Sequence, residues 1–151
     1  MVLAKEFLEM GLRGQIGKVC MDQNSPCYYS ESTDQALDET RRFIQLMREL
    51  VEGFEVERRI VEPVLTPRFV PTCSKELLEG LVRLSREKRN EGIRWQSHAA
   101  ESKGEVELCK EMLGGQKSDI DYFNEVSFFH LFFSLFRDLF ADSITSALFV
   151  S

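Results

Sequence analysis

A strand, a helix and a second strand between residues 61 and 98 restrict the fold of this chain most. Residues 61–65, in which Val61, Val64 and Leu65 are apolar, predict a strand that ends near Pro67, which cannot donate a ladder hydrogen bond. A helical pattern of leucines follows up to residue 84, and residues 93–97 predict the second strand. This order favours a right-handed parallel crossover. Arg68 and His98 are therefore expected at one edge of the sheet, where open α/β sheets and α/β barrels bind ligands.

The segments before residue 61 also alternate between helical and extended patterns. Residues 3–10 predict a helix that ends at Gly11. Residues 15–21 predict a strand, in which Gly14 and Gly17 allow a bulge or the close approach of another backbone. No targeting signal is visible in this part of the sequence.

Two capping-box patterns mark two further helices. Ser32 with Gln35 begins a helix that continues to Gly53, and Ser102 with Glu105 begins another after the second strand. Helices and strands thus alternate along the chain. The sequence predicts an α/β fold, with a parallel sheet covered by helices.

Composition limits the function classes. A chain of 151 residues with 43% hydrophobic and 29% charged residues is suited to one domain with a hydrophobic core. The net charge of −6 argues against non-specific nucleic-acid binding, because no basic cluster offsets phosphate repulsion. The cysteines form no CxxC pair and no secretory leader precedes them, which favours reduced thiols and a cytoplasmic location; they are Cys20, Cys27, Cys73 and Cys109.

Several sequence blocks, in collinear order, carry a family resemblance. They are GQIGKVCMD at 14–22, LTPRF at 65–69 followed by Cys73 and Ser74, QSH at 96–98 followed by Glu101, and EVE at 105–107. Together they resemble the middle of the guanine deaminases, which are metal-dependent amidohydrolases. The resemblance covers roughly residues 1–113, and several blocks in consistent order are more specific than any one alone.

The resemblance implies a fold, a reaction and a set of site residues. The family folds as a distorted (β/α)8 barrel, so the expectation is a partial (β/α)8 barrel with about three parallel strands. The reaction of the family replaces the exocyclic amine of guanine with a carbonyl, giving xanthine and ammonia. The resemblance also implies zinc as the cofactor. By resemblance His98 is the metal ligand, Glu101 the catalytic proton carrier, and Arg68 with Phe69 the pair that holds and stacks on guanine.

The chemistry of the reaction explains these residue types. Zinc lowers the pKa of bound water, a carboxylate relays the proton, and an arginine donates hydrogen bonds to the acceptor edge of a base. Glu101 follows His98 by an odd number of residues, so along an extended strand it would point to the opposite face. Its proposed role therefore requires a turn after His98.

The chain also departs from the family pattern. The family binds its metal with a His-x-His pair, two further histidines and an aspartate, and of these five ligands only His98 has a counterpart here. The one other histidine, His130, lies in an unlike segment. One imidazole does not build a catalytic zinc site. The expectation is an incomplete barrel without catalysis; the alternative is a non-catalytic interaction protein that retains the packing or dimer surfaces of a deaminase.

Each candidate has an ordinary structural interpretation as well. Arg68 is at a strand end, where ion pairing or helix capping is common. His98 can be a satisfied, partly buried histidine, and Glu101 a solvated carboxylate favoured by a helix N-terminus. Phe69 can belong to the core. A metal site of His98 with Cys20 and Cys27 matches no familiar ligand spacing.

Residues 114–151 have no counterpart that the resemblance places, and they are expected to form a separate, Phe-rich helical tail after a barrel segment of residues 1–113. Residues 126–151 hold seven of the twelve phenylalanines. The apolar run 126–141 is shorter than the roughly 20 residues that span a bilayer, so no membrane span is predicted. The interpretations are packing across the sheet, a membrane interface, and an abnormal C-terminus of the transcript. The abnormal C-terminus is the favoured origin and packing across the sheet the favoured physical outcome, with an oligomer as the main competitor.

Overall fold

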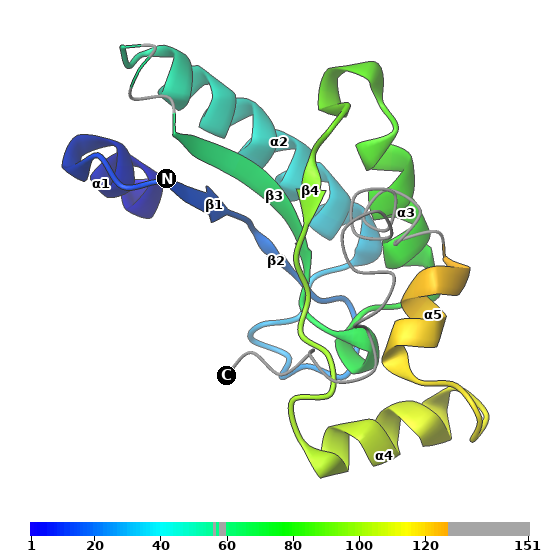
Figure 1. The fold of residues 1–151 in the computed structure, drawn as a ribbon. Coiled ribbons are helices and arrows are strands. Elements are labelled where there is room, and N and C mark those ends of the chain that lie inside the picture. Colours follow the sequence, from blue (N-terminus) through cyan, green and yellow to red (C-terminus); the bar gives the residue numbers. More distant parts are fainter. Residues whose placement is uncertain (56, 58–59, 127–151) are drawn as a thin grey trace, which may run out of the picture.

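Strand β3 (Val61–Pro67) is the centre of the structure, a computed structural model that describes residues 1–55, 57 and 60–126. On one side it pairs with β1 (Gly14–Ile16) and β2 (Val19–Cys20), and on the other with β4 (Arg94–Trp95). All of these pairs are parallel, and Figure 1 shows the strands running toward one end of the molecule. The predicted parallel crossover from β3 to β4 is confirmed.

Strands β1 and β2 are two parts of one strand path. Gly14 pairs with Val61 and Val19 with Thr66, so each residue of both strands faces the residue 47 positions later in β3. The register therefore does not change across the interruption at Gly17. A Cβ atom built on Gly17 would collide with the Thr66 side chain and lie 2.6 Å from the Val64 carbonyl oxygen. The predicted close backbone approach at Gly17 is confirmed.

Five helices surround the sheet in the described residues, together with two short 3₁₀ turns (Figure 1). In chain order they are α1 (Val2–Met10), α2 (Thr33–Glu52), η2 (Val70–Thr72), α3 (Lys75–Ser85), η3 (Lys88–Asn90), α4 (Lys103–Met112) and α5 (Asp119–Glu125). Helix α2 packs against both β3 and α3. Helix α4 lies beyond the ends of the strands, next to η2.

The helix boundaries follow local hydrogen bonds. The capping box of Ser32 and Gln35 forms as predicted, and α1 ends at Gly11 with a left-handed φ of 70°. The pattern at Ser102 forms only half of a box. Its hydroxyl accepts from the Glu105 N–H at 3.1 Å, but the Glu105 carboxylate turns back to the N–H of Glu101 instead of Ser102.

The core has two parts. The larger cluster joins α2, α3, β3 and β4, and it includes Phe123 of α5, which is 1% exposed. The smaller one packs α1 against α2 and the start of β3, and its buried members are Ala4, Leu8, Met47 and Val61. Helix α5 was not predicted as an element. It falls within the segment expected as a separate tail, yet Phe123 belongs to the main core.

Of the apolar run at residues 126–141, only Val126 belongs to the described part of the chain, where it directly follows α5. The strand predicted at residues 93–97 is shorter in the structure, although the N–H of Gln96 continues its pairing to the Leu65 carbonyl at 2.8 Å. Across the residues that the structure describes, no helix has both the length and the apolar character needed to cross a membrane.

Candidate functional site

The main chain of Arg68 joins the ends of the strand paths. Its N–H donates to the Cys20 carbonyl at 3.2 Å, and its carbonyl accepts from the N–H of His98 at 2.8 Å. Residues 20, 68 and 98 therefore lie next to one another at the C-terminal edge of the sheet. The predicted proximity of Arg68 and His98 is present in the structure.

The Arg68 side chain is exposed and lies against two neighbours. Its Nη1 is 3.2 Å from the Met21 sulfur, and its guanidinium carbon is 5.1 Å from the centre of the Phe69 ring, within the range of a cation–π contact. No carboxylate of the described residues forms an ion pair with Arg68. The guanidinium and the ring thus present a planar cation and an aromatic face together at the sheet edge.

The His98 ring is oriented by the same carbonyl group. Its Nδ1 is 3.0 Å from the Arg68 carbonyl oxygen. A carbonyl oxygen only accepts hydrogen bonds, so this contact assigns the proton to Nδ1 and leaves the lone pair of Nε2 available. Metal-binding histidines commonly have this arrangement, in which one ring nitrogen donates to a carbonyl and the other faces the metal. His98 is exposed rather than partly buried.

The chain turns between His98 and Glu101, which is the turn that the role predicted for Glu101 requires. Ala100 has a φ of 52°, a left-handed conformation that is uncommon for a residue with a Cβ. Its N–H donates to Asp119 Oδ2 at 2.8 Å, and the next N–H, of Glu101, donates to Glu105 Oε2 at 2.8 Å. The Glu101 side chain is exposed, and no hydrogen bond connects it to His98 or Arg68 within the described ranges.

Asp22 also lies at the C-terminal edge of the sheet, after β2, and it was not among the predicted site residues. Its carboxylate accepts from the Ser74 N–H at 2.7 Å and from the Thr33 hydroxyl at 2.7 Å. It therefore connects the end of β2 to the starts of α2 and α3. An aspartate directly after a strand, with hydroxyl residues at two later helix starts, is the signal that could have identified it.

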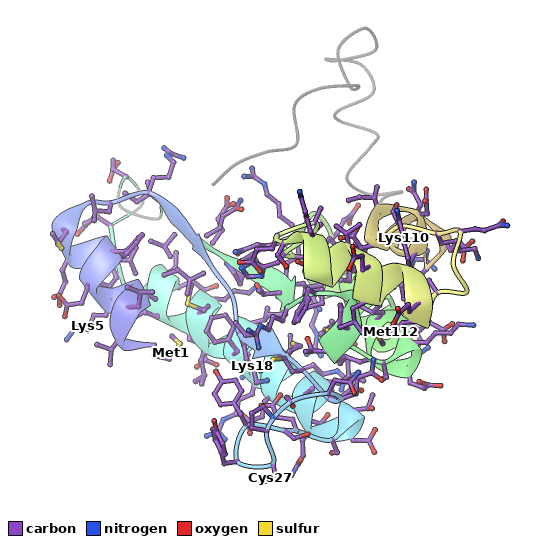
Figure 2. All side chains as sticks on the ribbon, turned by 90° about the horizontal axis from the view of Figure 1, so that it is seen from below. Met1, Lys5, Lys18, Cys27, Lys110 and Met112 are labelled. Carbon is purple, nitrogen blue, oxygen red and sulfur yellow. The ribbon has the colours of Figure 1, made fainter. Side chains whose placement is uncertain are left out.

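A cavity of about 380 Å³ opens beside these strand ends. It is lined by Lys18, Val19, Met21, Tyr28, Tyr29, Ser30 and Glu31. In the lining of this cavity, Lys18 Nζ and Glu31 Oε2 form an ion pair with a separation of 2.6 Å. Figure 2, which views the molecule from below, shows Lys18 beside the strands and Cys27 in the loop that projects from them. Met21 connects the cavity to Arg68, because it contacts the guanidinium.

A separate group of potential ligands lies between α4 and α5. One oxygen or sulfur atom from each of Glu105, Cys109 and Asp119 lies within 4.8 Å of the others. Burial, followed by the charges of Asp119 and Glu105, raises the pKa of Cys109 to about 11. The thiol is therefore neutral near physiological pH, and the two carboxylates already accept the backbone N–H groups of the turn. His98 does not belong to this group.

The raised thiol pKa values predict a labelling pattern. Burial raises the pKa of Cys73 to about 12 and that of Cys109 to about 11, and it also raises that of Cys20. At pH 8 a thiol reagent is expected to modify exposed Cys27 rapidly and the other three only after unfolding, as peptide mass spectrometry would show. Because these folded-state pKa values lie above the unfolded value of about 9, the stability that the buried thiols contribute is present at pH 8 and decreases as the pH rises from about 9 to about 12. Rapid native labelling of Cys109 would contradict the described packing.

Comparisons of the sequence with known proteins match one enzyme family. The sequence model of the amidohydrolase family matches residues 2–131. Guanine deaminase of Dictyostelium discoideum is 40% identical over 117 residues, which are 78% of this chain and 24% of that protein. A probable guanine deaminase of Schizosaccharomyces pombe is 38% identical over 124 residues, which are 82% of this chain and 22% of that protein. The chain thus spans about a quarter of the length of these relatives.

Solved structures give the same result. The crystal structure of guanine deaminase from C. acetobutylicum, with guanine bound in its active site, matches with a TM-score of 0.65 and 30% identity, covering 83% of this chain and 27% of that one. A triazine hydrolase matches with a TM-score of 0.61 at 16% identity, which supports the fold alone. The predicted partial (β/α)8 barrel is confirmed by these matches.

Proposed function

The chain belongs to the amidohydrolase family, and we propose that it forms the part of a zinc-dependent guanine deaminase that holds the base and supplies one metal ligand. The reaction is the hydrolytic deamination of guanine to xanthine and ammonia. One observation carries this proposal: the Arg68 carbonyl accepts from both the N–H and the Nδ1 of His98, so that the base-holding pair and the metal ligand share one sheet edge. Guanine deaminase relatives support the choice of substrate.

Arg68 and Phe69 hold the substrate in this proposal. A guanidinium offers several N–H donors in a fixed plane, which suits the carbonyl oxygen and ring nitrogens of guanine. The Arg68 guanidinium lies over one face of the Phe69 ring, 5.1 Å from its centre, so a stacked guanine would use the opposite face of the ring. The alternative of a non-catalytic interaction protein gains no support from the comparisons.

Of the residues present, His98 is the one that fits the role of a metal ligand. His98 directs Nδ1 to the Arg68 carbonyl, and its Nε2 is the nitrogen that would bind zinc. When bound, zinc supplies a water of lowered pKa. Glu101, directly after the turn at Ala100, is the group proposed to move the proton. Catalytic zinc sites ordinarily have three protein ligands, so these 151 residues by themselves are expected to bind zinc weakly and to lack turnover.

Guanine binding tests the proposal directly. In a titration of the 151-residue chain with guanine, NMR signals of Phe69 and His98 are expected to shift together. Arg68→Ala is expected to weaken this binding about 10-fold or more, because it removes charged hydrogen-bond donors. Arg86→Ala is the matched control, since Arg86 is an arginine at the far end of α3. Equal binding by both variants would rule out the proposed role of Arg68.

Metal analysis and ammonia release complete the test. The purified chain is expected to retain less than stoichiometric zinc after dialysis and to release no ammonia from guanine. His98→Ala is expected to remove the residual zinc affinity. Stoichiometric zinc with turnover in the unmodified chain would contradict the prediction of inactivity and place further ligands within this sequence.

The boundary at residue 113, the cytoplasmic location and association through the Phe-rich residues stay predictions. The family match extends to residue 131, and Phe123 lies in the core. Light scattering with size-exclusion chromatography measures the oligomeric state directly.

A further inference from the structure

The turn between His98 and Glu101 is held by residues outside the predicted site. Ala100 adopts a φ of 52°, which crowds its Cβ against the following carbonyl. An alanine keeps such a conformation only where its surroundings stabilise it. The turn is therefore a position at which the rest of the structure controls the direction of the chain.

A buried carboxylate supplies this stabilisation. Asp119, the first residue of α5, is 5% exposed, and its Oδ2 accepts from the N–H of Ala100 at 2.8 Å. Its Oδ1 accepts from the N–H of Ile120 at 2.9 Å, which fixes the carboxylate on the helix end. Hydrogen bonds to an ionised carboxylate are short and strong, and more so where water is excluded.

A second carboxylate holds the next amide. Glu105 Oε2 accepts from the N–H of Glu101 at 2.8 Å. Two carboxylates from different helices thus hold two consecutive amides, one at the turn and one at the proposed proton carrier. The Glu105 contact is local to α4, whereas the Asp119 contact connects the turn to α5.

We propose that Asp119 is a positioning residue, which acts through Ala100 to fix the direction of the chain between His98 and Glu101. This inference rests on the roles proposed above for those two residues. The Asp119 carboxylate acts on them through the main chain, because its bond to the Ala100 N–H sets the angle at which the chain leaves the sheet edge. Without it, the N–H of Ala100 loses its partner and the left-handed turn loses its stabilisation.

Amide hydrogen exchange of the unliganded chain tests the proposal. Asp119→Ala is expected to raise the exchange rate of the Ala100 amide about 10- to 100-fold, the loss expected for a hydrogen bond to a charged group. The Arg68 amide, bonded to Cys20 in the sheet, is the internal reference for global opening. It is expected to change much less than that of Ala100.

A matched control exists on the same helix. Asp121→Ala removes a carboxylate that accepts from the Ser118 N–H at 3.0 Å and caps the start of α5, and that forms no hydrogen bond with Ala100 among the described residues. It is expected to leave Ala100 exchange within about 3-fold of the parent chain, because it removes only a cap. Asp119→Asn retains an acceptor oxygen and similar volume, so it is expected to restore part of the protection and to carry the test if the alanine variant does not fold.

A second readout separates positioning from general stability. The ring nitrogen shifts of His98 report whether Nδ1 carries the proton, and Asp119→Ala is expected to change them while Asp121→Ala does not. Neither readout needs zinc or guanine, so a failure of the deaminase proposal leaves this test intact. The proposal is overturned if Asp119→Ala leaves either the Ala100 exchange rate or the His98 shifts unchanged, or if the exchange rates of Ala100 and Arg68 rise by the same factor.

Discussion

Replacing Gly17 with valine is expected to destabilise the chain by about 3 kcal/mol, near the upper end of ordinary overpacking costs. Even a single Cβ at this position would collide with the Thr66 side chain and lie 2.6 Å from the Val64 carbonyl oxygen. The Val64 oxygen belongs to the backbone of the central strand and cannot move without disturbing the parallel pairing, so rotation of the Thr66 side chain alone does not make room. The loss is expected to lower the urea concentration at the unfolding midpoint. In thermal unfolding it is expected to lower the melting temperature by about 10 °C.

Gly104→Ala is the control for the glycine substitution. Gly104 is exposed in the first turn of α4, and a Cβ there meets nothing within 4 Å. Alanine is favoured over glycine in a helix by up to about 1 kcal/mol, so this variant is expected to be neutral or slightly more stable. If Gly17→Val were as stable as Gly104→Ala, the close contact between the two strand paths would be wrong.

Replacing Phe123 with alanine is expected to cost about 3–5 kcal/mol, the range for removing a buried aromatic ring. Phe123 is 1% exposed and packs in the larger core cluster, together with residues of α3 and α4. Since a typical domain has a stability of only about 5–15 kcal/mol, this loss would leave a large unfolded fraction. Circular dichroism during thermal and urea unfolding measures it.

The outcome for Phe123 also tests the predicted boundary at residue 113. Tyr28→Ala is the control, because Tyr28 is 86% exposed and its removal is expected to cost less than about 0.5 kcal/mol. A small effect at Phe123 would support a separate tail that begins before α5. A large effect would make α5 a part of the barrel segment.

Local sequence signals predicted the framework well, for identifiable reasons. The cap at Ser32 and the end at Gly11 depend on contacts within a few residues, which a sequence displays directly. The parallel order of the strands follows from chain chirality and from the helix between β3 and β4. Helix α5 was missed because it has only seven residues, too few for a clear apolar period, and its burial depends on distant partners.

The features of the candidate site also differ in how far the sequence could predict them. The proximity of Arg68 and His98 could be predicted, because parallel strands finish at one edge. The need for a turn after His98 could be predicted too, but its position at Ala100 could not, since it depends on the Asp119 carboxylate far along the chain. Asp22 was missed although it follows a predicted strand, because its partners Ser74 and Thr33 are distant in sequence and their contacts with it are evident only in the fold.

The backbone and the side chain of Arg68 make separate sets of contacts. Its peptide group connects three strand ends, through bonds to Cys20 and His98 that any residue other than proline could make. Its side chain takes no part in these connections and lies instead against Met21 and Phe69. If Arg68 holds the base as proposed above, selection can exchange this side chain for another, and with it the preferred base, without changing the strand ends that the Arg68 peptide group connects.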